Sequence, residues 1–174
     1  MYPDTYQVRP AASVTSILSK ALTNFNKKIY SKHSDISASF YDTLILASVV
    51  EKEERSVANK AKVAGVLQRR IDGDCSDTGR TIGADATFCY PYAITSKECT
   101  PSFIVNHLDE DTEYNTRKHA GLPPTPISNP TDDSFLAARN PEGTACYYLH
   151  DSDGVIHFAN TAAQHNANKS KYLR

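Results

Sequence analysis

In the stretch ASVVEKEE, residues 47–54, acidic side chains directly follow an apolar run, and the other elements of the fold are predicted around this stretch. On a helix with 3.6 residues per turn, side chains three and four positions apart share a face. Glu53 therefore lies on the same stripe as Val49 and Val50, whereas Glu51 falls roughly on the opposite side. Ionising a carboxyl group on an apolar stripe is costly, so the pattern predicts a raised pKa for Glu53.

A carboxyl group that keeps its proton near neutral pH is what a general acid for glycosidic cleavage requires. Glu53 is the candidate for this role. The same position also suits a Glu at a helix end that is satisfied by a nearby Lys or Arg, because structural ion pairs are common. Spacing alone leaves both interpretations open.

Apolar residues at steps of three and four predict a helix over residues 40–54 around this segment. The same periodicity predicts four more helices, over residues 12–30, 56–71, 133–139 and 160–173. A turn ending in Gly154 predicts a hairpin of two short strands, over residues 145–149 and 155–158. We therefore expect an α+β fold, mostly helical with a small antiparallel β component.

Two further segments lack a clear helical period. Within residues 84–105, the aromatic residues Phe88, Tyr90 and Tyr92 alternate in a strand-like way. Residues 114–130 contain four prolines and predict an ordered, extended loop. Its aromatic, amide and hydroxyl groups on a stiff frame suit an uncharged polar ligand such as a sugar, although a proline-rich peptide motif fits the spacing as well.

The overall composition narrows the function classes. A length of 174 residues predicts one domain over 1–174. The 19 basic and 20 acidic residues give a formal net charge of −1, which argues against nucleic acid as a partner. The sequence contains no run of 18 apolar residues, the length that a helix needs to span a bilayer, and it does not begin with a signal peptide.

The four cysteines, Cys75, Cys89, Cys99 and Cys146, have no C-x-x-C spacing. In an oxidising compartment, one disulfide among the first three is plausible. Three complete pairings and four unpaired thiols all remain open. Cys146 could act as a hydrolase nucleophile with His157 or His165 as its base, but its apolar neighbours favour a buried, inert thiol. No histidine spacing is typical of a metal site, so we expect no metal or other cofactor.

Taken together and in their order, these segments resemble the YceG-like catalytic domain of the endolytic murein transglycosylases. The resemblance covers essentially the whole chain. The matching segments are YPDTY at 2–6, LASVVEKE at 46–53, KVAGVLQRR at 62–70, DAT at 85–87 with Tyr90, YNT at 114–116, GLPPTPISNP at 121–130 and HFANTAAQHN at 157–166.

The resemblance implies a lysozyme-like fold and cleavage of the β-1,4 bond between N-acetylmuramic acid and N-acetylglucosamine in peptidoglycan glycan strands. Family members leave 1,6-anhydro ends instead of hydrolysing the bond. The family's catalytic Glu falls on Glu53, which would act first as acid and then as base. Full-length members carry an N-terminal membrane helix and a LysM-like domain, face the outside of the bacterial membrane and work near peptidoglycan synthases.

The resemblance also assigns substrate contacts, and we expect the domain to be monomeric. The expected contacts are Asp85, Thr87, Tyr90, Tyr114, Asn115, Thr116, Pro123, Asn129, His157, His165 and Asn166. The chain departs from the family pattern at Glu54, which replaces a Thr, at Ala86, which replaces a Pro, and near Gly83. These departures motivate an alternative, a glycan-binding module without catalytic activity.

Overall fold

The computed structural model describes residues 1–36, 39–95 and 97–173. Its helices and strands are α1 (Val14–Lys28), α2 (Phe40–Glu53), α3 (Val57–Asp72), α4 (Asp85–Cys89), α5 (Pro101–His107), α6 (Asp132–Arg139), β1 (Tyr147–His150), β2 (Ile156–Ala159) and α7 (Ala162–Tyr172). The expected α+β class, mostly helical with a small antiparallel component, is confirmed. Within the described ranges, no helix is both long and apolar enough to cross a membrane.

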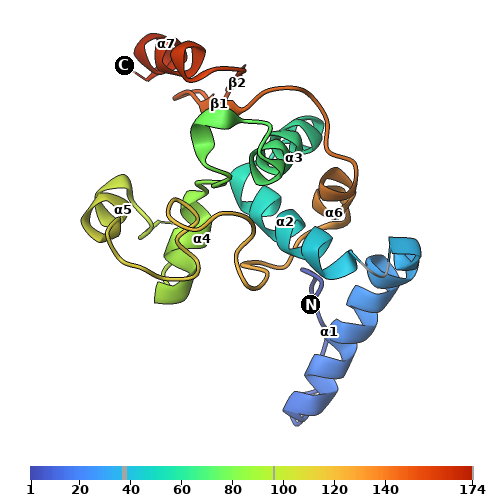
Figure 1. The fold of residues 1–174 in the computed structure, drawn as a ribbon. Coiled ribbons are helices and arrows are strands. Elements are labelled where there is room, and N and C mark those ends of the chain that lie inside the picture. The colour runs from blue at the N-terminus through green and yellow to red at the C-terminus, as the bar shows by residue number, and fades with distance from the viewer. Residues whose placement is uncertain (37–38, 96, 174) are drawn as a thin grey trace.

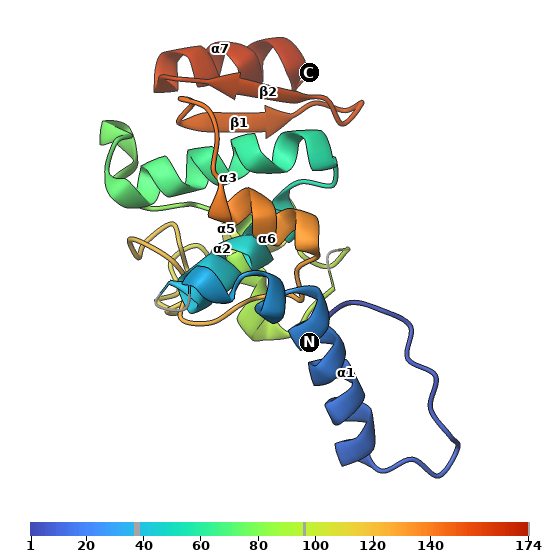
Figure 2. The same ribbon diagram turned by 90° about the vertical axis from the view of Figure 1, so that its right-hand side faces the viewer.

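Helix α2 lies at the centre of the molecule and packs against α3 and α6 (Figure 1). Its six consecutive residues from Ile45 to Val50 are all buried, because a helix surrounded by other elements must be apolar on most of its circumference. Figure 2 shows the layers: the β1–β2 hairpin lies between α7 and α3, while α1 projects away from the body. This arrangement places the end of α2, with Glu53, beneath the hairpin.

One partly buried carboxylate joins the three central helices. Glu51 accepts hydrogen bonds from Lys60 of α3 (3.1 Å) and from Ser134 of α6 (2.5 Å). It also accepts bonds from the backbone amide (3.0 Å) and the hydroxyl (2.8 Å) of Thr131, which caps α6. Burial alone would raise the pKa of Glu51, but these hydrogen bonds outweigh it and hold the pKa below its usual value.

The antiparallel hairpin lies within two residues of its expected position. Tyr148 is opposite Phe158, and Leu149 is opposite His157. The side chain of Asp151 accepts hydrogen bonds from two backbone amides of the turn, at 3.0 and 2.8 Å. The turn thereby fixes the register that decides which side chains of β1 face α2.

The strand-like alternation of Phe88, Tyr90 and Tyr92 does not correspond to a strand. The described residues of this segment form α4, a 3₁₀ turn over Tyr90–Tyr92, and α5. Phe88 and Tyr92 are four positions apart, so a helical path places them on one face, where their ring centroids are 6.0 Å apart. They form a small second cluster with Phe103 of α5. Alternation in a short aromatic segment therefore did not distinguish a strand from a helix.

All four cysteines are paired, as Cys75–Cys146 and Cys89–Cys99. The expectation of a disulfide among Cys75, Cys89 and Cys99 is confirmed by the second pair. The interpretations of Cys146 as a nucleophile or as an inert thiol are both wrong, because its sulfur is bonded to Cys75. The first disulfide ties the loop after α3 to the segment before β1, and the second closes the loop between α4 and α5.

We expect the two disulfides to contribute unequally to stability. Replacing both Cys75 and Cys146 by Ser should lower the free energy of unfolding by about 4 kcal/mol, and replacing both Cys89 and Cys99 by about 3 kcal/mol. The first disulfide should contribute more because it closes the longer loop: its cysteines are 71 positions apart, whereas those of the second are 10 positions apart. Urea unfolding under oxidising conditions measures both losses, and the reverse order would contradict the expectation.

Glu51→Gln should lower the free energy of unfolding by about 3 kcal/mol at pH 7, because it leaves the Lys60 ammonium buried without its partner charge. A pKa lowered by folding stabilises the protein above the unfolded pKa and ceases to do so in acid. The difference between wild type and variant should therefore shrink as the pH falls below about 4.5, the ordinary value of a Glu. Urea unfolding at several pH values tests this, with the exposed Glu113→Gln as control. A constant difference across this range would contradict it.

Candidate functional site

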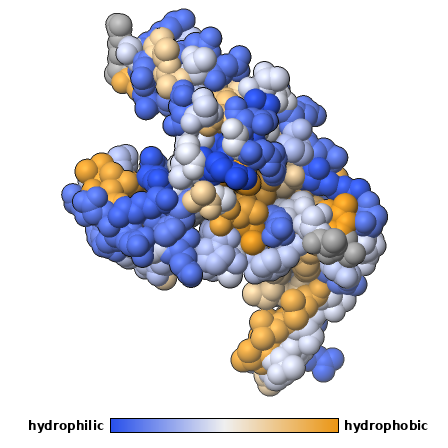
Figure 3. Space-filling model, in the orientation of Figure 1, coloured by the Kyte–Doolittle hydropathy of each residue, from blue (hydrophilic) through white to orange (hydrophobic). Residues whose placement is uncertain are grey.

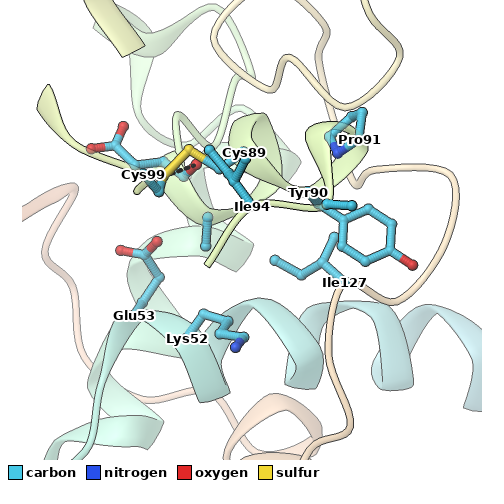
Figure 4. Close-up of a pocket in the computed structure, with 11 residues that line it drawn as sticks. Lys52, Glu53, Cys89, Tyr90, Pro91, Ile94, Cys99 and Ile127 are labelled. Atoms are coloured by element: carbon cyan, nitrogen blue, oxygen red, sulfur yellow. Dashed lines mark hydrogen bonds between the residues drawn. A yellow bond between two sulfur atoms is a disulfide. The ribbon is translucent and has the colours of Figure 1, made fainter. Parts of the chain in front are cut away.

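The last turn of α2 carries Glu53 to the wall of a cavity of about 650 Å³ (Figure 4). The opposite wall comes from α4 and the segment that follows it. The lining residues are Lys52, Glu53, Asp85, Ala86, Cys89, Tyr90, Pro91, Ala93, Ile94, Cys99 and Ile127. In Figure 4 the carboxyl group of Glu53 points into the cavity on the side of the Cys89–Cys99 disulfide, and Tyr90 and Ile127 lie farther along it. We call this space the apolar cavity.

A second cavity of about 520 Å³ adjoins Glu53, and we call it the cationic cavity. Its walls come from α3, the loop after it, β1 and α7. The lining residues are Glu53, Arg70, Asp77, Thr78, Thr81, Gly83, Asp85, Arg117, Tyr147, Tyr148, Leu149, His165 and Lys169. Glu53 and Asp85 line both cavities. In the space-filling view, a hollow separates the lobe that carries α5 from the part that carries α7 (Figure 3).

The pKa of Glu53 is raised, chiefly because burial disfavours the charged carboxylate. The nearby negative charge of Asp85 raises it further. A hydrogen bond from the hydroxyl of Tyr148, at 2.8 Å, works in the opposite direction, as do His150 and the backbone amide of Ala86. The net result is a pKa above the ordinary value of a Glu, for a carboxyl group at the boundary of the two cavities. The alternative of a helix-end Glu paired with a Lys or Arg does not apply, since no described Lys or Arg forms an ion pair with Glu53.

Tyr148 and His150 approach α2 from the same face of β1, because alternate residues of a strand share a face. The Tyr148 hydroxyl is buried beside Glu53, and its own pKa is raised well above the ordinary value by burial and by that carboxylate. Tyr148 therefore remains a hydrogen-bond donor. His150 contacts Glu54 at 3.1 Å, and Glu54 also accepts the backbone amide of Ser56 at 2.6 Å. The carboxylate of Glu54 is thus bound to His150 and to the backbone of Ser56, and it lines neither cavity.

Several of the expected substrate contacts reach the cavities. Asp85 forms an ion pair with Arg117 and lines both spaces. Tyr90 lines the apolar cavity, with its ring centroid 5.2 Å from that of Tyr114. His165 lines the cationic cavity. These residues come from separate parts of the chain and meet around Glu53.

Other expected contacts lie inside the protein. Asn115 is fully buried and donates hydrogen bonds to the carbonyls of Leu108 (3.1 Å) and Glu110 (2.9 Å). The buried hydroxyls of Thr87 and Thr116 are 2.7 Å apart, and that of Thr116 also accepts the amide of Ala84. These side chains shape the loops behind the cavity wall and do not line it.

The remaining expected contacts are also outside both cavities. Pro123 is buried in the proline-containing loop, whereas Asn129 and Asn166 are exposed. His157 contacts Asp151 at 2.7 Å and stacks on Tyr172, with ring centroids 3.6 Å apart. No group of three or more His, Cys, Asp or Glu side chains in the described ranges is arranged to hold a metal ion.

Sequence reasoning missed Tyr148, Arg70, Arg117 and Lys169. Tyr148 lies in the expected strand over residues 145–149. The sequence contained no signal for which face meets α2. The three cations reach one cavity from α3, the loop at 117 and α7, a proximity that only the tertiary fold creates.

Tyr148→Phe should raise the pKa of Glu53 further, because it removes a hydrogen bond that stabilises the charged carboxylate. Carbon-13 NMR titration of the Glu53 carboxyl, assigned by comparison with Glu53→Gln, measures the shift. Tyr147→Phe is the matched control, since Tyr147 precedes Tyr148 on the strand and forms no hydrogen bond with Glu53. An unchanged or lowered pKa in Tyr148→Phe would rule out this role.

Comparison with known proteins supports the resemblance. The sequence matches the YceG-like family over residues 1–171. It is 28% identical to the endolytic murein transglycosylase of Bacillus subtilis strain 168, over 99% of this chain and 47% of that protein. It is 22% identical to the endolytic murein transglycosylase of Streptococcus pneumoniae strain D39, over 99% of this chain and 32% of that protein.

A crystal structure of a YceG-like protein from Listeria monocytogenes superposes with a TM-score of 0.79 and 27% sequence identity. The superposition covers 95% of this chain and 52% of that one. The chain thus spans about a third to a half of the length of these relatives. Because the family match extends over nearly every residue and the fold agrees, the chain belongs to the YceG-like family.

Proposed function

We propose that residues 1–174 are the catalytic domain of an endolytic lytic transglycosylase acting on peptidoglycan. The domain would cleave the β-1,4 bond between N-acetylmuramic acid and N-acetylglucosamine and leave a 1,6-anhydro end. The observation that carries this proposal is a carboxyl group with a raised pKa, Glu53, at the boundary of two adjoining cavities. The printed names of the relatives from Bacillus subtilis and Streptococcus pneumoniae support the same substrate class.

The acids around Glu53 favour a mechanism with one carboxyl group. A retaining or inverting glycosidase uses two carboxyl groups across the bond. Glu51 is on the other side of α2, bound to α3 and α6, and Glu54 is held by His150. Asp85 faces the cavities but pairs with Arg117, and its charge raises the pKa of Glu53. Asp85 thus helps to keep the acid protonated.

In the proposed reaction, Glu53 donates its proton to the glycosidic oxygen as the bond from that oxygen to muramic C1 breaks. The N-acetylglucosamine side leaves with the proton on its O4. The muramic C6 hydroxyl oxygen attacks C1, and the Glu53 carboxylate takes the hydroxyl proton. This step closes the 1,6-anhydro ring and restores the acid. The intramolecular attack needs no positioned water and benefits from proximity.

The apolar cavity offers a surface for sugar rings. Tyr90, Ile94 and Ile127 line it, and the ring of Tyr114 packs against that of Tyr90. Aromatic and aliphatic walls with a few polar groups are typical of ligand sites. We propose that Thr87, Asn115 and Thr116 serve this site as positioning residues, because their hydrogen bonds fix the loops behind the wall.

We further propose that the domain works outside the cytoplasm as a monomer, near the synthases that supply new glycan strands. Peptidoglycan lies outside the cytoplasmic membrane. Two disulfides fit an oxidising compartment, since such bonds are rare in the reducing cytosol. Anchoring by a membrane helix outside residues 1–174 is part of the same proposal and rests on the family resemblance alone.

Glu53→Gln should reduce the release of 1,6-anhydro ends from purified glycan strands by about 1000-fold, because an amide cannot donate the proton. Mass spectrometry of the digested strands measures the products. Glu113→Gln, an exposed change of the same kind, is the control and should act like wild type. Undiminished release by Glu53→Gln would refute the assignment of the acid.

The same experiment separates two rivals. A glycan-binding module, motivated by the departures at Glu54, Ala86 and near Gly83, would bind strands while the wild type releases no anhydro ends. A hydrolase using Asp85 as its second carboxylate would release reducing muramic ends that incorporate oxygen from labelled water. Either result would overturn the proposed transglycosylase.

A further inference from the structure

The cationic cavity contains an arginine without an acidic partner. Arg70 donates to the carbonyl of Cys146 at 2.8 Å and to that of Ile82 at 2.5 Å, and its guanidinium lies 5.3 Å from the centre of the Tyr147 ring. Within the part of the chain that the structure describes, no carboxylate forms an ion pair with it. Burial lowers the pKa of Arg70, which remains charged at neutral pH. A partly buried positive charge bound only by carbonyls and a ring retains the capacity to attract an anion.

A second observation comes from His165 in the same cavity. Its ring stacks on Tyr147, with centroids 5.1 Å apart. The buried Nδ1 atom has no hydrogen-bond partner among the described residues. Buried polar atoms are nearly always bonded, so this atom retains a hydrogen-bonding capacity that the described residues leave unused beside the cavity.

With Glu53 in the protonated form that the proposed function requires, the balance of charge in this cavity is positive. Arg70, Arg117 and Lys169 supply three cations. Asp77 and Asp85 supply two negative charges, and Glu53 supplies none while it is protonated. The glycan backbone of peptidoglycan is uncharged, so sugar binding does not account for this excess. The acidic groups of the polymer are carboxylates on the branch at muramic O3: the free lactyl carboxylate where the peptide is missing, or those of the stem peptide where it is present.

We infer that the cationic cavity is a carboxylate-binding subsite for the O3 branch of a muramyl residue next to the cleaved bond, an inference that rests on the proposed function. The residues that would bind the carboxylate are Arg70, Arg117, Lys169 and His165. The position of the cavity beside Glu53 requires the muramyl residue to adjoin the scissile bond. The cavity of about 520 Å³ has room for a lactyl group or the first part of a peptide. Guanidinium groups are suited to carboxylates because their donors match the two oxygens.

The test measures binding, with the protein carrying Glu53→Gln so that strands are not consumed. The probes are end-labelled glycan strands with stem peptides, strands stripped by an amidase, and each kind after its carboxylates are converted to amides. Fluorescence anisotropy gives the dissociation constants. Amide conversion should weaken binding about tenfold, the size expected for loss of a charge-assisted contact. Equal affinity for native and amidated strands would overturn the subsite.

The unmodified strands identify the source of the carboxylate. Stripped strands that bind as tightly as intact ones would assign the lactyl carboxylate. Stripped strands that bind as weakly as amidated ones would assign the stem peptide. Both results support the subsite, which is defined by the chemistry that the two sources share.

A pair of double variants tests the location. Arg117→Gln with Lys169→Gln should weaken binding of unmodified strands about tenfold and leave amidated strands unaffected. Lys118→Gln with Lys171→Gln is the matched control, because it removes the same charge from neighbouring positions outside the cavity. The control should change affinity less than about twofold, since exposed charges are screened. Equal effects of the two double variants would refute the location.

Failure of the subsite and failure of the proposed function are distinguishable. Release of anhydro ends by the wild type, together with binding indifferent to amide conversion, would remove the subsite alone. Binding that depends on carboxylates, without any anhydro ends from the wild type, would remove the proposed reaction and leave the subsite in place.

Discussion

The structure depends on how the carboxylate of Glu51 is satisfied. Its Oε2 atom accepts hydrogen bonds from two other helical segments, from Lys60 of α3 and from Thr131 and Ser134 at the start of α6, and these partners compensate the cost of partly burying the charge. One carboxylate therefore links α2 to both α3 and α6. One turn earlier, Ser48 binds the incoming loop through the amide of Ile127 at 2.9 Å and the hydroxyl of Ser128 at 2.9 Å. The C-terminal half of α2 is held along one side, and the other side is free to face the cavities.

This asymmetry separates two glutamates that are two positions apart. One oxygen of Glu51 accepts four hydrogen bonds, so its pKa falls despite partial burial. Glu53 accepts a side-chain hydrogen bond from one phenol and lies near the charge of Asp85, and burial disfavours its charged form, so its pKa rises. Identical side chains on one helix thus acquire opposite protonation preferences from their surroundings, which is how acid and base roles are assigned in enzymes. The glutamate with the lowered pKa links three helices, and the one with the raised pKa lines the two cavities.

The sequence alone predicted the helix over 40–54 and the separation of Glu51 from Glu53, because helical periodicity is a local property. It predicted the hairpin from its turn. It did not show whether residues 84–105 form strands or helices, because the spacing of Phe88 and Tyr92 fits both a two-residue and a four-residue period. It could not pair Cys75 with Cys146, 71 positions away, or reveal that Asn115 is buried. The cavity walls are built from segments that are distant in the sequence and meet only in the tertiary structure. Tyr148 and Arg70 are part of such walls, so their place in the site could not be predicted.

A different disulfide stabilises the wall of each of the two cavities. The Cys89–Cys99 disulfide holds the apolar wall, and the Cys75–Cys146 disulfide holds the segment whose carbonyl binds Arg70. The departures from the family pattern divide in the same way. Ala86 lines the apolar cavity, whereas Gly83 lines the cationic one, where its φ of +63° suits glycine. The third departure, Glu54, directly follows α2, where it binds His150 and the backbone amide of Ser56 and lines neither cavity. The departures at Ala86 and near Gly83 therefore alter the cavity walls, whereas the one at Glu54 alters the end of the helix that carries Glu53.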